Sequence, residues 1–210
     1  MKNNKLKEKV FDSAWKIVEN EGMDQLTIRG IAELSGCSLG AINDVLDNFQ
    51  DLQLRINSHI LSCLYQTIEE TTTLAIKNNK PLKELLRDLA KAYIDFGQKH
   101  RLLWKALFEH APSSRFPEWY IKHTHAGIYQ VSKKLAVTFS IPENEIRKFL
   151  GFFWAAIHGI CSILLNKKLD TVADFFNVDI HLEPYIEYCL QGLLPNQTTS
   201  NCKKQETLLP

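Results

Sequence analysis

The stretch at residues 27–43, which reads TIRGIAELSGCSLGAIN, limits most strongly what this chain can fold into. Ala32 is small at a point where two helices must approach closely. Gly36 suits a short turn whose left-handed backbone is cheap only without a Cβ atom. Ile42 is expected to anchor the second helix to the core, and Ser38 can cap that helix. The pattern predicts a helix-turn-helix, the motif whose second helix lies in the major groove of DNA.

Further residues of this motif have expected roles. The apolar residues expected to join Ile42 in the core are Ile28, Ile31, Leu34 and Val45. Residues 38–45 are the part that would enter the groove. The candidate DNA-binding residues are Thr27, Arg29, Ser38, Leu39, Ala41 and Asn43.

These candidates differ in the contact that each can make. Asn43 can pair with an adenine edge or a phosphate, and Thr27, Arg29 and Ser38 can donate hydrogen bonds to phosphates. Thr27 and Ser38 have an alternative role as helix caps, which is compatible with a phosphate contact because both use the start of a helix. Arg29 has the alternative of a solvated surface residue.

Nearly every segment has helical periodicity, and no convincing alternating strand pattern appears. Outside the motif, the expected helices lie at residues 5–21, 48–77, 82–97, 100–110, 118–139, 143–168 and 183–194. The chain is therefore predicted to be all-α, with an N-terminal three-helix helix-turn-helix unit at residues 1–55 and a larger C-terminal helical bundle at 56–194. Residues 195–210 are polar, lack periodicity and are expected to be disordered.

The composition is that of an ordinary soluble globular protein, with 45% hydrophobic and 23% charged residues. The charged N-terminus has no apolar stretch behind it, which argues against a secretory signal. The five cysteines are Cys37, Cys63, Cys161, Cys189 and Cys202. Their odd number and the lack of a CxxC pair indicate reduced thiols in a cytoplasmic protein.

No motif of an enzyme is apparent. The sequence has no glycine-rich phosphate loop, no GxSxG and no HExxH. His123 and His125 would lie on different sides of a helix and make a poor metal pair. We therefore expect no catalytic residue, no metal and no cofactor.

The segment at 143–168 is apolar on two neighbouring faces. One face consists of Ile146, Leu150, Phe153, Ile157 and Ile160, and the other of Phe149, Phe152, Ala156 and Ile163. Its apolar run from residue 149 to 165 falls just short of a membrane span, so no membrane partner is expected. One face would meet the core of its own chain and the other a second subunit, since a C2 dimer presents the same patch twice. The alternative is a fully buried central helix.

Residues 9–56 resemble the N-terminal region of the TetR family of transcriptional regulators. The residues that carry the resemblance are Val10, Ala14, Ile17, Val18, Gly22, Thr27, Ile31, Ala32, Gly36, Ser38, Gly40 and Leu52. In the C-terminal region, the run from Trp154 to Gly159 (WAAIHG) is similar to the Trp/His-Gly signature in the ligand domain of one TetR subgroup. The resemblance implies a homodimeric repressor. It would bind operator DNA and release it when a small molecule enters the ligand-binding and dimerisation domain at 56–194.

The DNA face departs from the family at several positions. Asn43 stands where the family usually has an aromatic residue, often Tyr, and Val45 where another aromatic residue or His is usual. Leu46 replaces a usual Phe. Phe49 occupies the place of a Lys that contacts a phosphate. Because phosphate contacts carry much of DNA affinity, these changes should weaken binding.

The charge of the N-terminal region also predicts weak DNA binding. Residues 1–55 contain seven basic and nine acidic side chains, a net charge of −2. Asp44, Asp47 and Asp51 follow the second helix of the motif, and only the Lys-rich N-terminal arm is basic. The alternative function is therefore a TetR-fold module that binds a small molecule, a lipid or a protein and has weak or lost DNA binding.

Aromatic residues concentrate in the C-terminal region and suggest a pocket for a small hydrophobic or aromatic effector. The candidate ligand-binding residues are Trp104, Phe108, Tyr120, Phe153, Trp154 and His158. An ordinary core would explain most of them as well. His158 lies one turn from Trp154 and could anchor a ligand, or it could be a core histidine with satisfied hydrogen bonds.

Overall fold

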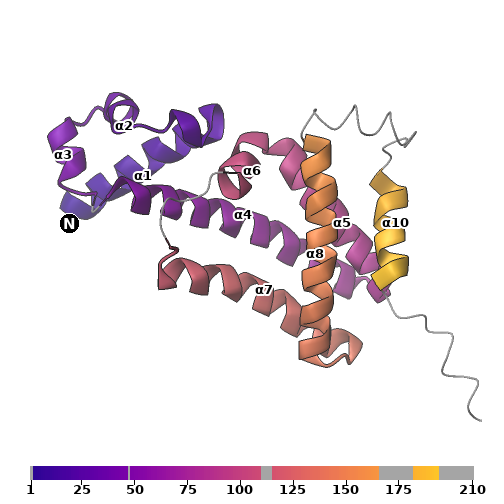
Figure 1. Cartoon of the computed structure of the whole chain (residues 1–210). Helices are drawn as coiled ribbons and strands as arrows, with labels where there is room; N and C mark the ends of the chain where they lie inside the picture. The colour runs from indigo at the N-terminus through magenta and orange to yellow at the C-terminus, as the bar shows by residue number, and fades with distance from the viewer. Residues whose placement is uncertain (1, 47, 110–114, 166–181, 194–210) are drawn as a thin grey trace, which may run out of the picture.

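The computed structural model describes residues 2–46, 48–109, 115–165 and 182–193, and this part of the chain contains helices and no strand (Figure 1). The all-α prediction is therefore confirmed. The helices are α1 (Lys2–Glu21), the 3₁₀ turn η1 (Met23–Gln25), α2 (Ile28–Ser35), α3 (Leu39–Asn43), α4 (Phe49–Lys77), α5 (Leu82–Lys99), α6 (Arg101–Phe108), α7 (Glu118–Phe139), α8 (Glu143–Leu165) and α10 (Leu182–Leu193). The expected tail at 195–210 lies outside the described residues.

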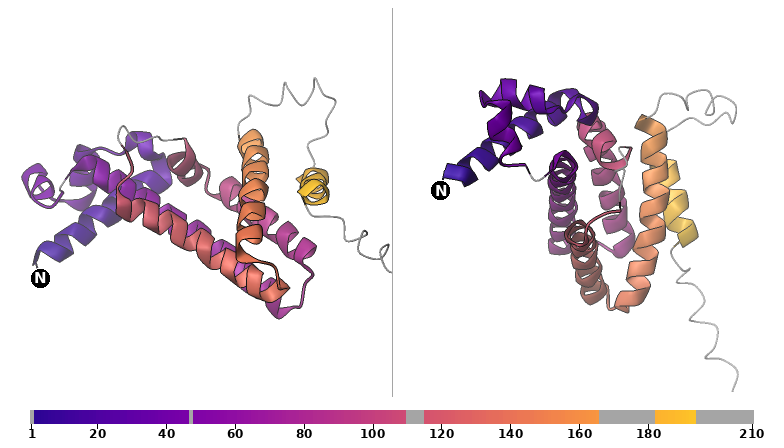
Figure 2. Two further views of the ribbon diagram at one scale, coloured as in Figure 1. Left: turned by 60° about the horizontal axis from the view of Figure 1, so that its bottom comes forward. Right: turned by 60° about the vertical axis from the view of Figure 1, so that its left-hand side comes forward.

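The first three helices gather at one end of the molecule, together with the N-terminus (Figures 1 and 2). From this unit α4 runs into the bundle without a break, across residue 55, where the sequence places the domain boundary. There α4 contacts α5 and α7, while α8 contacts α5, α7 and α10. The N-terminal unit also meets α6, which contacts both α1 and η1.

Local chemistry explains the helix-turn-helix. The Thr27 side chain accepts a hydrogen bond from the Gly30 N–H at 3.0 Å and so caps α2. Gly36 ends α2 with φ 64° and ψ 25°, the left-handed conformation that glycine adopts without strain. Ser38 caps α3 by accepting from the Ala41 N–H at 3.2 Å. The sequence predicts the turn at Gly36 and the Ser38 cap, and the Thr27 cap is the alternative that stood beside its DNA-binding role.

One apolar residue of the motif does not join the core. Ile31 and Ile42 are fully buried, but Leu34 is 53% exposed, so its expected core position is wrong. The buried side of α2 is set by Ile31 and Ser35, which are four residues apart. Leu34 precedes Ser35 by one residue and thus lies about 100° away from that side.

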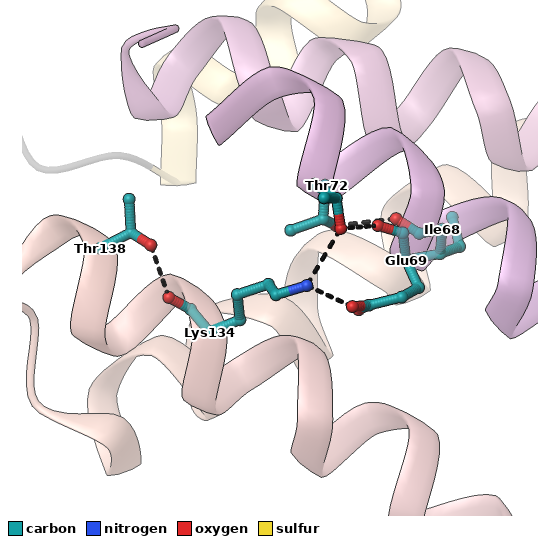
Figure 3. Close-up of polar contacts among 6 residues, drawn as sticks. Ile68, Glu69, Thr72, Lys134 and Thr138 are labelled. Atoms are coloured by element: carbon teal, nitrogen blue, oxygen red, sulfur yellow. Dashed lines mark hydrogen bonds and ion pairs between the residues drawn. The ribbon is translucent and has the colours of Figure 1, made fainter. Parts of the chain in front are cut away.

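A polar and aromatic seam joins α4 to α7. Lys134 reaches from α7 to the Glu69 carboxylate of α4 (Figure 3). It also donates to the Thr73 hydroxyl at 3.0 Å. Further along, the Tyr65 hydroxyl donates to the Thr124 carbonyl at 2.7 Å. The Tyr65 ring lies over Gly127, where a Cβ atom would come within 2.2 Å of the ring. Only glycine lets the two helices approach this closely.

Candidate functional site

The six candidate DNA-binding residues lie on α2, α3 and their caps, and most are exposed. Thr27, Ser38 and Asn43 are exposed, Leu39 is 50% exposed and Ala41 is half-buried. Thr27 and Ser38 both act as caps, so their capping alternative is observed. Asn43 is the last residue of α3, a helix of five residues.

The cations near α3 have acidic neighbours. Arg29 is 86% exposed and pairs with Glu33 at 3.2 Å, one turn further along α2. Arg55 pairs with Asp51 at 2.6 Å on α4. These pairs place negative charge beside each guanidinium, so a phosphate would have to compete for it.

Charge is divided unevenly within the N-terminal unit. Residues 1–9 contain four lysines and one glutamate, a net charge of +3. Residues 10–55 contain three basic and eight acidic residues, a net charge of −5. The basic part belongs to the first turns of α1, where Lys5, Lys7 and Lys9 are exposed. The positive potential of this unit is therefore centred on the N-terminal end of α1, at the same end of the molecule as α3 (Figure 1).

Four of the six candidate ligand-binding residues meet in one place. The His158 ring of α8 lies between two indoles at interplanar angles of 24°, with centroid distances of 5.3 Å to Trp104 and 5.2 Å to Trp154. The Phe108 ring of α6 is 4.6 Å from the same imidazole. Tyr93 of α5 completes the group, 5.0 Å from Trp104. We call these five residues the aromatic cluster.

The polar atoms of the aromatic cluster form a directed chain of hydrogen bonds. The Trp154 indole can only donate, and its N–H reaches the Tyr93 oxygen at 3.1 Å. The Tyr93 oxygen lies 2.9 Å from His158 Nδ1, and we assign Tyr93 as the donor of this bond. With this assignment the proton of neutral His158 resides on Nε2, which lies 3.4 Å from Ser162 Oγ. Both ring nitrogens have partners, as expected for a core histidine.

Burial reinforces this neutral state. Burial of the imidazole lowers the pKa of His158, and burial raises the pKa of the Tyr93 hydroxyl. Both groups are therefore uncharged near neutral pH. The aromatic cluster consequently presents ring faces and no formal charge to a ligand.

We expect the stability of the fold to fall as the pH drops through about 6.5, the pKa of an unfolded histidine. Because the pKa of His158 is lowered in the folded state, the unfolded chain binds more protons in this range. The variant His158→Gln should show a weaker decrease in its urea midpoint between pH 7.5 and 5.5. His125→Gln, at an exposed position of α7, should retain the wild-type decrease. Equal decreases for wild type and His158→Gln would contradict the assignment.

The other two ligand candidates lie outside the aromatic cluster. Tyr120 is 8% exposed at the start of α7, where its ring stacks on Phe116 at 5.0 Å. Phe153 is 5% exposed and stacks on Phe149 at 5.9 Å within the main core. The structure thus separates the six candidates into the aromatic cluster and two neighbouring groups.

Two tyrosines that were not among the candidates contribute to this region. Tyr93 is the hub of the hydrogen-bond chain. Burial, with a smaller contribution from Tyr120, raises the pKa of Tyr65 to about 12. In the sequence both tyrosines occur within apolar helical patterns. The sequence signal that could have identified them is that a buried tyrosine hydroxyl needs a hydrogen-bond partner.

Helix α6 connects the aromatic cluster with the N-terminal unit. Trp104 and Phe108 face His158. Leu102 lies against Gly22, which has φ 94° and whose absent Cβ would be 3.5 Å from the leucine. Lys105 pairs with Asp24 at 3.3 Å. A small cavity between the two parts is lined by Glu21, Gly22, Met23, Asp24, Leu102, Lys105, Ala106 and Glu109.

Helix α8 leaves an apolar face uncovered. It is long and apolar enough to cross a membrane by length and composition, but core and interface helices meet the same criterion. Only 17% of its most apolar stretch is buried against the chain. The exposed side includes Phe152 and Ile163, 68% and 43% exposed. A fully buried central helix, the alternative from the sequence, is therefore wrong.

Comparisons with known proteins agree with this architecture. Residues 86–180 match the family described as tetracyclin repressor-like, C-terminal domain. The structure is similar to that of a protein with unknown function from Rhodococcus sp. RHA1, with a TM-score of 0.65 and 18% identity, covering 90% of this chain and 96% of that chain. It is also similar to the multidrug binding protein EbrR complexed with imidazole, with a TM-score of 0.59 and 16% identity, covering 91% and 96%. At these identities the two structures bear on the fold alone. A comparison with curated proteins gives no match.

Proposed function

We propose that this chain is a ligand-responsive transcriptional regulator of the TetR family, because residues 86–180 match that family's C-terminal domain and the fold is consistent with it. In this proposal it works in the cytoplasm, binds operator DNA as a homodimer and acts as a repressor. The observation that carries the proposal is the position of α6. One side of this helix contacts the aromatic cluster, and another contacts the corner between α1 and α2.

The proposed response begins at the aromatic cluster. A small hydrophobic or aromatic effector would stack on its rings and displace Trp104 or Phe108, which are one turn apart on α6. Movement of α6 would be passed to the N-terminal unit at Gly22 and Asp24, and α4 would follow. The effector shifts the DNA-binding state only if it prefers one arrangement of these helices over the other. Tyr120 and Phe153 remain candidates for further ligand contacts.

The uncovered face of α8 supports the homodimer. A second copy would cover Phe152 and Ile163 by the same patch, as in a C2 dimer. Gly151, Ala155 and Gly159 recur every four residues beside these side chains, and each is exposed. Small residues on one side allow two helices to approach closely at an interface.

A second function is favoured by one specific observation, the net charge of −5 on residues 10–55. In this alternative the chain is a TetR-fold module that binds a small molecule, a lipid or a protein and has weak or lost DNA binding. The alternative predicts no selective DNA binding at any salt concentration. The regulator predicts selective binding that weakens with salt, because phosphate contacts release counterions.

Selection from a random DNA pool tests the regulator directly. The full-length wild type is expected to enrich one family of sequences at low and at moderate salt. Arg29→Ala combined with Asn43→Ala should lower affinity for the enriched sequence about tenfold or more, since a good base contact contributes about 1–3 kcal/mol. Sedimentation of the same sample, with and without the enriched duplex, measures whether the binding species is a dimer.

A matched control distinguishes the loss of a DNA contact from a general effect of removing arginine and asparagine side chains. Arg115→Ala combined with Asn144→Ala removes the same residue types at exposed positions of the C-terminal bundle. This variant should bind the enriched sequence like the wild type. If wild type enriches no sequence at either salt concentration, the regulator is rejected and the binding module is favoured.

A further inference from the structure

One buried polar atom in the described part of the chain has no hydrogen-bond partner. It is Oδ1 of Asn57, whose residue is only 4% exposed. The two other buried polar side chains of the described bundle are satisfied: Thr72 donates to the Ile68 carbonyl at 2.7 Å, and Ser132 donates to the Ile128 carbonyl at 2.8 Å. Asn57 thus differs from the other polar groups that this bundle buries.

An unpaired buried oxygen has a cost in the folded state. Removing such an atom from water without a new partner costs about 1–3 kcal/mol. An aliphatic side chain at this position would avoid the cost, as Leu54 and Leu61 do one turn to either side, each 6% exposed. Folding therefore gains nothing from the unpaired oxygen at Asn57 that a leucine would not supply.

The position of Asn57 on α4 is inside the C-terminal bundle. The next residue, Ser58, faces α7, since its carbonyl is 3.2 Å from His123 Nε2. Ile56 and Ile60 lie on the other side of Asn57 and belong to the main core, which also contains Trp104 of the aromatic cluster. Asn57 is therefore placed between the side of α4 that meets α7 and the side that meets this core.

We propose that Asn57 is the polar anchor of the effector, and that its Oδ1 accepts a hydrogen bond from a hydroxyl or N–H group of the bound molecule. This inference rests on the proposed function, in which a small molecule enters the C-terminal bundle. It narrows the effector to an aromatic molecule that carries a hydrogen-bond donor. The rings of the bundle hold the apolar part, and Asn57 distinguishes this class from purely apolar molecules of the same size.

Phenol and toluene test this distinction, because they have nearly the same size and only phenol can donate. Calorimetric titration of the full-length wild type should show a preference for phenol of about fivefold to tenfold, the value of one net hydrogen bond. In Asn57→Leu the preference should vanish. The thermal midpoint of ligand-free Asn57→Leu should equal or exceed that of the wild type, whereas a structural role of the amide would lower it.

Thr72→Val is the matched control on the same helix. It replaces another buried polar side chain by an apolar one of similar shape, but the Thr72 hydroxyl already has a partner. This variant should keep the preference for phenol. Failure of the wild type to bind phenol, equal affinity for the two probes, or a preference that survives in Asn57→Leu would overturn the inference. The selection from random DNA is independent of these titrations, so rejection of the regulator is recognised separately.

Discussion

Trp104→Ala is expected to lower the free energy of unfolding by about 3–5 kcal/mol, the range for removal of a buried tryptophan. Trp104 is 2% exposed, and three rings surround it: Tyr93 at 5.0 Å, Phe108 at 4.5 Å and His158 at 5.3 Å. The substitution leaves a cavity that the neighbouring helices cannot fill without moving. Since a domain of this kind has about 5–15 kcal/mol of stability in total, the variant would be close to unfolding.

Trp154→Ala provides the comparison for this result. Trp154 stacks on the same imidazole but is 49% exposed, so its removal should cost about half as much or less. Both variants are measured by urea unfolding at one protein concentration, because the apparent stability of a dimer depends on concentration. Equal losses for the two variants would show that Trp104 is not the centre of the aromatic cluster.

Gly127→Val is expected to be the second most damaging substitution, with a loss of about 3 kcal/mol from overpacking. The first added carbon would come within 2.2, 2.3 and 2.6 Å of three atoms of the Tyr65 ring. This ring cannot turn away easily, because its hydroxyl donates to the Thr124 carbonyl on the same helix as Gly127. Urea unfolding followed by circular dichroism measures the change.

Two further variants test whether the clash with Tyr65 causes the loss of stability in Gly127→Val. Gly192→Ala also replaces a helical glycine, but a Cβ there meets no atom of the described residues within 4 Å, so the substitution should be neutral or slightly stabilising. In the double variant Tyr65→Ala with Gly127→Val, the clash is absent. The loss should therefore be smaller than the sum of the two single losses. Strictly additive losses would mean that Gly127 and Tyr65 do not interact.

Local signals in the sequence were sufficient for the helices and for the helix-turn-helix. Gly22 and Gly36 stop α1 and α2, and Ser38 caps α3, as predicted. Gly97 shows where such a signal is insufficient. It is the last residue of the helix expected at 82–97, but α5 continues to Lys99. Its missing side chain instead makes room for Cys161 and Trp104, which a Cβ atom would approach to 2.9 and 3.0 Å.

The sequence predicts which residues form the candidate site, but only partly which of them contact one another. The sequence predicts six ligand-binding residues, of which Trp104, Phe108, Trp154 and His158 meet in the structure. Tyr120 and Phe153 lie in two other groups, and the ligand-binding role of all six stays a prediction. The role of Tyr93 depends on atoms that are 61 and 65 residues away along the chain. Periodicity identifies the apolar side of each helix, but it does not say which two sides meet, and no local rule selects an unpaired oxygen at Asn57.

The sequence by itself thus determined the all-α class, most helix boundaries and the turn at Gly36, because these depend on side chains within a few residues of one another. The tertiary structure alone decided that α6 touches both the aromatic cluster and the corner at Gly22, that Tyr65 requires a glycine at 127, and that α8 is left partly uncovered. These features arise from contacts between distant segments, whose geometry is set only when the helices pack together.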